Sequence, residues 1–388
     1  MRLKLILPQV VPTALQPPSV CPYEGCGGQH FRFHQAVGKL LRDTRYPEVG
    51  AHRYECLRCG RTFRVYPKGV TRAYISLRVK GLAVLLYLLG LSYGAVSLAL
   101  EALGTYMCKS RVYDAVQSVA ERVPGLKREQ VFEGLKTPAL GGDLTSVKVN
   151  GRWLTLGLTV DDLSGLALTI DDLSGEDAET LREWMAPIAE AVEAQILVTD
   201  DADALKSVAD ELGLEQQVCK GHVKRNTESL IESLQPAVTA DADGSLAAIG
   251  VTPEQAKADL ARLGELIRTR RPEDMDELAK MHLRYIGASP PGAGEKASIA
   301  YRLRLLFLDR WNLWPRLTRY RTWQGPNGET IDGTNNGSER AIGWWVKERY
   351  RTMRGYKRDQ SAVNVSRLLA WCGNYLDRGG ADLSLLVA

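Results

Sequence analysis

The stretch from residue 138 to residue 219 constrains the fold most, because its hydrophobic periodicity changes in a definite order. Three strand-like runs come first, and the Asn150-Gly151 dipeptide after the first of them is a strong hairpin signal. These runs cover residues 143–149, 153–160 and 166–170. A helix, a strand, a second helix and a fifth strand are then expected at residues 178–194, 195–199, 204–212 and 217–219. The predicted order is therefore βββαβαβ.

That order predicts a ribonuclease H-like core, in which the first and fourth strands are neighbours at the centre of one sheet. Asp143 lies on the first strand, and Asp200 directly follows the fourth. We therefore expect these two carboxylates to meet, with the adjacent Asp201 as the rival for the second position. Two acidic pairs that precede Leu-Ser-Gly turns are expected to be solvated surface groups, namely Asp161, Asp162, Asp171 and Asp172.

Four of the seven cysteines lie in the first 60 residues, as two close pairs. Cys21 and Cys26 have four residues between them, Cys56 and Cys59 have two, and 29 residues separate the pairs. Two such pairs on tight turns form a tetrahedral cage for structural Zn²⁺, and the long spacing favours a ribbon with a long β-loop. Buried free thiols are the alternative. Substitute ligands are available in His30, His34 and His52.

Residues 78–122 break into helical segments with Gly-containing turns between them, which is typical of a helix-turn-helix. The segments are expected at residues 80–89, 93–103 and 111–123. Ser92 and Ser110 are the expected caps of the second and third. The start of the third helix, where base contacts are usually made, carries Lys109, Arg111 and Tyr113. An ordinary helical bundle is the alternative interpretation.

Charge is distributed unevenly, although the net charge is only +4. Residues 31–80 hold twelve Lys and Arg against three acids, and residues 340–358 hold seven against one. Residues 143–218 reverse the balance, with seventeen acids against four bases. Basic ends around an acidic middle suggest DNA-binding regions on either side of a metal-dependent centre. The alternative is that these charged stretches are simply solvated surface. No apolar run reaches the roughly 18 residues of a spanning helix, and no signal pattern opens the chain, so a cytoplasmic protein is expected.

The chain resembles bacterial insertion-sequence transposases of the Mutator-like group. The resemblance rests on Asp143 in Gly-Gly-Asp-Leu-Thr, Asp200 in Leu-Val-Thr-Asp-Asp, the Cys219-Lys-Gly-His222 element and Glu339 in Asn-Asn-Gly-Ser-Glu-Arg. It implies a prokaryotic, nucleoid-associated protein with a DDE triad, in which the Glu begins a helix after a long helical insertion. It also implies that the Cys-x-x-His element supports the active site, by packing, by contact with the substrate strand or through His222 as a proton relay.

Three carboxylates suit two Mg²⁺ or Mn²⁺ ions, since these ions prefer oxygen ligands. Such a pair stabilises the charge on the attacking and leaving oxygens of phosphodiester cleavage and strand transfer. Asp143 is expected to bridge both ions, while Asp200 and Glu339 each hold one. Ser338 is the expected cap of the helix that Glu339 begins. Contacts with DNA phosphates are expected from Arg225, Arg340, Lys347, Arg351 and Arg354.

The resemblance spans residues 138–370, and the 139 positions from Asp200 to Glu339 are expected to hold an all-α insertion domain. Its best helical candidates are residues 252–268, 272–285 and 296–314. Core packing is the expected role of Trp311, Trp314 and Trp323, and stacking on unpaired bases is the alternative. The predicted fold class is a multidomain α+β protein. Its expected parts are a zinc-binding ribbon (1–72), a helix-turn-helix domain (73–125), the first part of a ribonuclease H-like core (138–226), the insertion (227–333) and the C-terminal core helix (334–378).

These features predict an active transposase that binds transposon-end DNA and catalyses strand cleavage and strand transfer. The expected partners are double-stranded DNA with terminal inverted repeats, target DNA, and at least a second copy of the chain, because two ends must be brought together. No membrane partner is expected. A transposase-derived DNA-binding regulator without cutting activity and a structure-selective nuclease of the same fold are the alternatives.

Overall fold

The computed structural model describes residues 3–131, 135–352 and 355–387. The chain divides into two compact units, each built from segments that are distant in sequence. The first unit combines residues 1–126, 146–156 and 341–388, and the second combines residues 127–145 and 157–340. Arg354, for which a DNA contact is predicted, lies outside the described residues. In the described chain, no helix combines the length and the apolar character that crossing a membrane requires.

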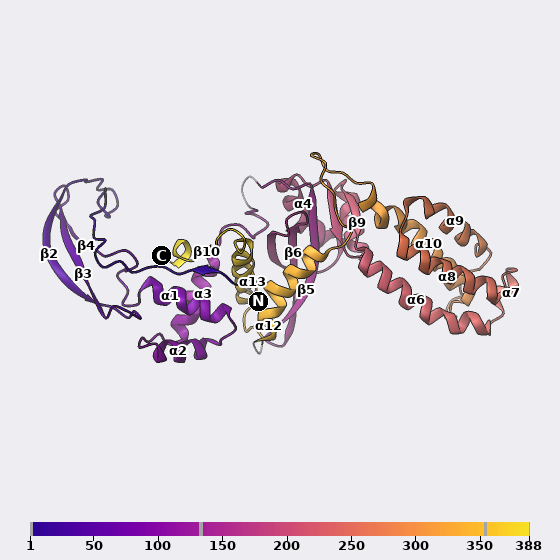
Figure 1. Cartoon of the computed structure of the whole chain (residues 1–388), viewed down its shortest axis with the longest axis horizontal. Coiled ribbons are helices and arrows are strands. Elements are labelled where there is room, and N and C mark those ends of the chain that lie inside the picture. Colours follow the sequence, from indigo (N-terminus) through magenta and orange to yellow (C-terminus); the bar gives the residue numbers. More distant parts are fainter. Residues whose placement is uncertain (1–2, 132–134, 353–354, 388) are drawn as a thin grey trace. The chain divides into compact units, whose positions relative to one another are not determined.

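The N-terminal part of the first unit is an antiparallel ribbon of three strands (Figure 1). The strands β2, β3 and β4 cover Phe31–Leu40, Glu48–Cys56 and Thr62–Val65. β2 and β3 form a long hairpin between the two cysteine pairs, which confirms the expected β-loop. A small apolar core supports the hairpin and consists of Val10, Leu41, Val49 and Val70.

Three helices follow, at Leu77–Leu88 (α1), Tyr93–Ala102 (α2) and Lys109–Glu121 (α3). Ser92 caps α2 as predicted, because its side chain accepts a hydrogen bond from the Ala95 amide. The prediction that Ser110 is a cap is wrong. Cys108 already has the extended backbone of a cap residue, so α3 starts at Lys109 and Ser110 lies in its first turn.

The C-terminal part of the chain completes the first unit. Helix α13 (Asp359–Asn374) and helix α14 (Ser384–Val387) both pack against α3. The short strand β1 (Leu5–Ile6) pairs in parallel with β10 (Ala381–Asp382), so the two ends of the chain meet. Residues from both ends of the sequence therefore form one folded body around α3.

A five-stranded sheet with the order β7-β6-β5-β8-β9 supplies the strands of the second unit, to which β5 contributes its residues up to 145 and β6 its residues from 157. The strands are β5 (Ala139–Val149), β6 (Arg152–Asp161), β7 (Ala167–Leu173), β8 (Ile196–Thr199) and β9 (Glu215–Val218). The β5–β8 and β8–β9 pairs are parallel. β5 and β8, which are the first and fourth strands of this sheet along the chain, are central neighbours. This is the strand order expected for a ribonuclease H-like core.

The two faces of this sheet are covered by different parts of the chain. On one face, Leu140 and Leu197 pack in a core with helices α4 (Ala178–Val192) and α5 (Asp203–Glu211). On the other face, Ala139, Ile196 and Val198 pack with Trp323 and Ile331. Because successive residues of a strand point to opposite faces, positions 139, 141 and 143 of β5 share this second face.

Helices between β9 and the last part of the second unit form a bundle with its own apolar core (Figure 1). They are α6 (Lys220–Ala240), α7 (Ser245–Ala248), α8 (Pro253–Thr269), α9 (Met275–Arg284) and α10 (Ile299–Thr318). The three predicted helices correspond to α8, α9 and α10. Trp314 is fully buried and donates a hydrogen bond to the Arg271 carbonyl at 2.7 Å, and Trp323 is also buried, so both pack in cores as expected.

Two of the four acids expected at the surface are buried. Asp161 accepts hydrogen bonds from Thr137 Oγ1 at 2.6 Å and from the Leu163 amide at 3.1 Å. Asp171 accepts one from the Trp184 indole Nε1 at 3.1 Å. The prediction is wrong for both carboxylates, since these donors replace the water that a turn position would otherwise supply.

The segment that carries Glu339 is helical, but it starts earlier than predicted. Helix α11 covers Asn336–Ala341, and the Asn335 carbonyl accepts the first helical hydrogen bond, from the Glu339 amide at 3.0 Å. Ser338 is therefore inside the helix and fully buried, and the prediction that it caps the helix is wrong. A π-helical stretch, Ile342–Lys347, and helix α12, Glu348–Arg351, continue the chain.

Candidate metal centre and nucleic-acid interface

Backbone pairing of β5 with β8 brings together the two strands near whose ends the predicted acids Asp143 and Asp200 lie. The parallel register joins Ala139 to Ile196 and Gly141 to Val198. This pairing ends two residues before Asp143 and two residues before Asp200. Asp143 alternates onto the strand face of Ala139 and Gly141, away from α4, and Asp200 directly follows β8.

Helix α11 brings Glu339 to that same face. A Cβ atom added to Gly141 would lie 2.9 Å from Ser338 Oγ, so the helix packs on β5 two residues before Asp143. A glycine at position 141 leaves the space that this close approach requires. Glu339, in the first turn of α11, keeps its side chain 41% exposed and available to a ligand.

The Cys219-x-x-His222 element lies beside Glu339. The Cys219 amide donates to the Thr199 carbonyl at 2.8 Å, which fixes the start of α6 next to Asp200. His222 Nε2 lies 3.4 Å from Glu339 Oε1. The structure thus brings Glu339 together with both predicted supporting residues, Cys219 and His222.

Asp200 and its rival Asp201 have different surroundings. The carboxylate of Asp201 lies 2.8 Å from Lys206 Nζ and 4.0 Å from Arg310 Nη1, two cations that it shares with Asp203 and Asp309. One oxygen of Asp200 accepts a hydrogen bond from the Ala202 amide at 3.1 Å, as in an Asx turn. These contacts favour Asp200 as the ligand and Asp201 as a structural residue.

Asp162 is an acid near this site that the sequence reasoning assigned to the surface. Its Oδ1 would lie 3.6 Å from Cβ atoms added to Gly141 or Gly337, so it adjoins both β5 and α11. Burial raises the pKa of Asp162 to about 7, and the negative charges of Asp332 and Asp161 raise it further. Two consecutive aspartates before a turn gave no signal of this position, because it depends on how α11 packs.

We predict that Asp162 makes stability fall as pH rises from about 4 to about 7. The folded state holds this proton up to a pKa of about 7, whereas the unfolded chain releases it near 3.8. Asp162→Asn removes the cost of burying an ionised carboxylate. The substitution should increase the free energy of unfolding at pH 8 by roughly 1–3 kcal/mol, with a smaller gain at pH 5. Urea unfolding at both pH values measures this, with the exposed Asp172→Asn as the control. Equal gains at pH 5 and pH 8 would contradict the assignment.

The four N-terminal cysteines converge on one point of the first unit. All four Sγ atoms lie within 4.8 Å of one another, with Cys21 and Cys59 at 3.9 Å and Cys26 and Cys56 at 3.7 Å. A tetrahedral ion with Zn–S bonds of about 2.3 Å requires sulfur separations of about 3.8 Å. The two measured sulfur separations match that value, so the cluster is compatible with a zinc ion.

The surroundings of the cage act on its thiols in opposite directions. The backbone amide of Cys59 is the main cause that lowers the pKa of Cys56 to about 7, whereas burial raises the pKa of Cys21 to about 12. A Cβ atom added to Gly28 would lie 2.7 Å from Cys56 Sγ, so the backbone closes tightly over the sulfur. Gly25, Gly27 and Gly60 have positive φ values, which is how the chain turns sharply around each cysteine pair.

We expect the ribbon to hold one structural zinc ion. Cys56→Ser should remove one equivalent of tightly bound zinc, because sulfur supplies a quarter of the cage and serine is a poor ligand. Elemental analysis of purified protein gives the zinc content, and circular dichroism reports loss of the ribbon. Cys108→Ser, outside the cage, is the matched control. Zinc content that Cys56→Ser leaves unchanged would rule out the cage.

Two residues of α3 predicted to contact DNA line one cavity with a third from α12. Lys109, Tyr113 and Arg351 belong to a space of about 970 Å³ in the first unit, here called the tyrosine cavity. No carboxylate is among its described lining residues. Its cations are Lys109, Arg349, Arg351, Lys357 and Arg358. Such an excess of positive charge favours an anionic ligand.

Aromatic rings form part of the wall of the tyrosine cavity. Tyr87 and Tyr93 are stacked with centroids 4.4 Å apart, and Tyr113 meets Tyr93 edge-on at 5.4 Å. Arg349 is buried over the Tyr87 ring at 4.3 Å and donates to neutral oxygens of Thr352 and Leu91. Cations interleaved with aromatic rings are typical of sites for nucleic-acid strands.

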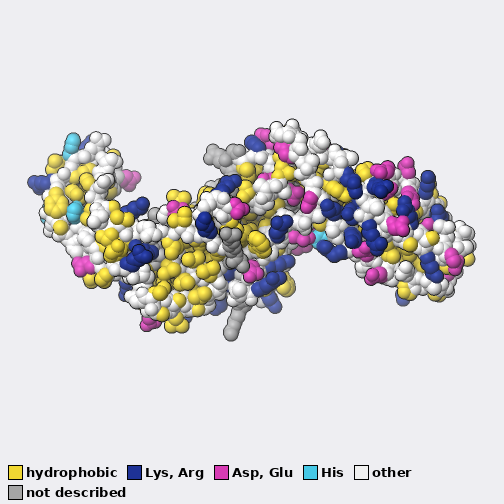
Figure 2. Space-filling model, viewed as in Figure 1, with side chains coloured by type: hydrophobic (Ala, Val, Ile, Leu, Met, Phe, Trp, Pro, Cys, Tyr) yellow, Lys and Arg dark blue, Asp and Glu magenta, His cyan; other side chains and the backbone are white. Residues whose placement is uncertain are grey.

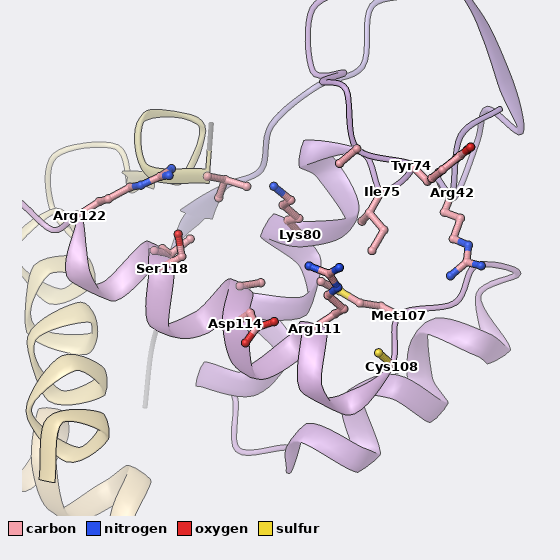
Figure 3. A pocket seen from close by; sticks show the side chains of 14 residues that line it. Arg42, Tyr74, Ile75, Lys80, Met107, Cys108, Arg111, Asp114, Ser118 and Arg122 are labelled. Atoms are coloured by element: carbon pink, nitrogen blue, oxygen red, sulfur yellow. The ribbon is translucent and has the colours of Figure 1, made fainter. Parts of the chain in front are cut away.

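Arg111 points to a different place. Residues two positions apart on a helix face different sides, and Arg111 lines a separate cavity of about 540 Å³ with Arg42, Lys80 and Arg122 (Figure 3). Burial lowers the pKa of Lys80, and the charges of Arg122 and Arg111 lower it further. Asp114 is the acid in the lining. The structure therefore separates Arg111 from Lys109 and Tyr113.

The remaining predicted DNA contacts are exposed. Arg225, Arg340 and Lys347 all have exposed side chains. Figure 2 shows Lys and Arg side chains gathered on the second unit where α6 and α10 meet the sheet. Some cations of this region are neutralised within the fold, since Arg316 and Arg319 pair with Asp210 and Glu215. Arg225 and Arg340 have no such pairing among the described residues.

Comparison with known proteins yields likeness in structure alone. No family model matches the chain, and no curated protein matches it. The catalytic core domain of HTLV-2 integrase is 21% identical, over 28% of this chain and 77% of that one, with a TM-score of 0.19. The catalytic core domain of BIV integrase is 11% identical, over 56% and 100%, with a TM-score of 0.19. The Drosophila P element transposase, in a strand transfer complex, is 9% identical over 78% and 93%, with a TM-score of 0.40.

Proposed function

We propose that the protein is a DDE-type DNA transposase of the insertion-sequence, Mutator-like kind. The observation that carries the proposal is the parallel pairing of β5 with β8, which ends two residues before Asp143 and Asp200, together with the packing of α11, which carries Glu339, on β5. Three carboxylates from distant segments on one sheet face would form a site that simple packing does not require. Asp143 is the firmest member, because both its strand and its face follow from the pairing.

The donor set fits two Mg²⁺ or Mn²⁺ ions. Carboxylate oxygens are the ligands that these ions prefer, and Asp143, Asp200 and Glu339 would hold them. Two ions about 4 Å apart, with bonds of about 2.1 Å, allow ligand oxygens as much as roughly 8 Å apart. In the described chain the three acids do not form a cage as tight as 4.8 Å, and a two-ion site does not need one.

The ions would stabilise negative charge on the attacking and leaving oxygens of a phosphodiester. The chain's own residues position these groups. His222 contacts Glu339, so it would orient that carboxylate and would accept a proton from an attacking water or 3′-hydroxyl. Arg225 and Arg340, exposed near the same helices, would hold the DNA backbone.

The rest of the chain would recognise transposon ends. The zinc ribbon (1–72) and the helices of the helix-turn-helix (73–125) would bind the terminal inverted repeats, with Lys109, Tyr113 and Arg351 gripping DNA through the tyrosine cavity. The insertion (227–333) would separate the core parts (138–226 and 334–378). Two ends and a target must be held together, so a dimer or larger assembly would act at the nucleoid of a prokaryotic cell.

Two alternatives remain distinct in their expected behaviour. A transposase-derived regulator would bind the same DNA without cutting it. A structure-selective nuclease would cut branched DNA without regard to the terminal sequence. The exposed Glu339 beside His222 favours catalysis over regulation, and the separate cationic cavities of the first unit favour recognition of a defined DNA end.

Asp143→Asn and Asp200→Asn should each abolish Mg²⁺-dependent cleavage, because each removes a charged metal ligand, with a loss of at least about 1,000-fold. Asp201→Asn should retain most of the activity, because Asp201 pairs with Lys206 inside the fold. The substrate is DNA from both flanks of the protein's own gene, and the products are resolved on a denaturing gel. Cleavage that survives Asp143→Asn would sink the proposal. Loss of cleavage in Asp201→Asn but not in Asp200→Asn would overturn the assignment of Asp200 as the second ligand.

Removing cations from the tyrosine cavity should weaken DNA binding. Lys109→Ala and Arg351→Ala should each lower affinity for the flanking DNA and reduce the slope of log K against log salt by about 1 if each neutralises one phosphate. Fluorescence anisotropy at several salt concentrations measures both quantities. Lys136→Ala is the control, because this exposed lysine of the second unit pairs with Glu193. An unchanged slope in both variants would exclude the cavity from the interface.

A further inference from the structure

Three side chains of different chemistry converge beside the proposed catalytic acids. The sulfur of Cys219, an imidazole nitrogen of His222 and a carboxylate oxygen of Glu339 all lie within 4.8 Å of one another. A Cys-x-x-His pair alone offers too few ligands for an ion. Glu339, which comes from a separate helix, supplies the third.

The fold holds these donors in place through the backbone. Cys219 immediately precedes α6, and His222 lies three residues later in its first turn, so the two side chains share one side of the helix. The Cys219 amide donates to the Thr199 carbonyl at 2.8 Å, and the Lys220 amide donates to the Gly333 carbonyl at 2.9 Å. The second bond ties the start of α6 to the segment that leads into α11.

The imidazole has bonding capacity that the described chain does not use. His222 Nδ1 is buried and has no hydrogen-bond partner among the described residues, while Nε2 lies 3.4 Å from Glu339 Oε1. A buried polar atom without a partner is costly, and an ion or a ligand is one of the ways in which such a cost is met. Cys219 is only 2% exposed, so its sulfur is shielded from solvent yet adjoins the two other donors.

We infer that Cys219, His222 and Glu339 form a binding site for a zinc-type ion, distinct in chemistry from the Mg²⁺ site. Sulfur, imidazole and carboxylate together suit Zn²⁺ and its probes Co²⁺ and Cd²⁺, whereas Mg²⁺ selects oxygen ligands. Three protein ligands leave a fourth position open. The ion would draw Glu339 away from the Mg²⁺ site, so zinc would act as an inhibitor of strand cleavage. Only this inhibitory consequence rests on the proposed function.

The binding test uses Co²⁺ as the probe with the full chain, its ribbon already loaded with zinc. Bound at this site, Co²⁺ should give a thiolate charge-transfer band in the near ultraviolet, with zinc content unchanged. Cys219→Ser should abolish the band, and His222→Ala should weaken Co²⁺ binding at least about tenfold, the lower end of what loss of even an outer-shell partner costs. His222 is one-third exposed, so its alanine variant should fold. Cys372→Ser, which removes another fully buried cysteine, is the control.

Absence of the band in the wild-type chain, or a band that persists in Cys219→Ser, would overturn the site. If the band kept its full strength in His222→Ala, the His222–Glu339 contact would be only a hydrogen bond. That result would also overturn the proposed metal site. These outcomes do not depend on DNA cleavage, so they are separate from failure of the proposed transposase activity.

The inhibitory consequence has its own measurement. Mg²⁺-dependent cleavage of the flanking DNA is followed as Zn²⁺ is added, and each variant is normalised to its own activity without zinc. The wild-type chain should lose activity as the site fills and recover it when a chelator is added, while His222→Ala should need at least about tenfold more Zn²⁺ for half-inhibition. Full activity with the site occupied would show that zinc leaves Glu339 in place, and would overturn the inhibitory role.

Discussion

The parallel pairing of β5 with β8 is the constraint on which the proposed site depends. It fixes which residues of the two strands stand opposite each other and which face of the sheet each side chain occupies. Leu140 and Leu197 are thereby committed to the core beneath α4, while Ala139 and Val198 are committed to the opposite face. In the proposed site, backbone hydrogen bonds and apolar burial, and not an interaction between the carboxylates, would bring Asp143 and Asp200 together.

Much of this arrangement could be predicted from the sequence because it follows from local periodicity. Alternation of apolar residues gave the strands, the Asn150-Gly151 turn gave the first hairpin, and the order of the elements gave the central pairing. The cysteine pairs likewise indicated a cage, since their spacing alone forces two tight turns. Features that depend on short stretches of chain were therefore accessible before any coordinates.

The features that were missed depend on contacts between distant segments. Asp161 and Asp171 look like turn residues, and only the fold shows that Thr137 and Trp184 supply them with hydrogen bonds. The tyrosine cavity combines α3 with residues more than 200 positions further along, so no pattern within either segment reveals it. Ser338 was misplaced by a shift of a few residues, since helix ends are set by which carbonyl accepts the first hydrogen bond.

The contrast between Gly141 and Gly142 has a consequence for how this chain can evolve. A side chain at position 141 would run into Val160 and into Ser338 of α11, and one at position 142 would run into Met185 of α4. Losing or gaining a single residue early in β5 would exchange these faces, turning Asp143 into the apolar core and a leucine into the site. No single substitution could restore the original faces after such an insertion or deletion. Lineages that keep the site must therefore preserve the length of this strand more strictly than its composition.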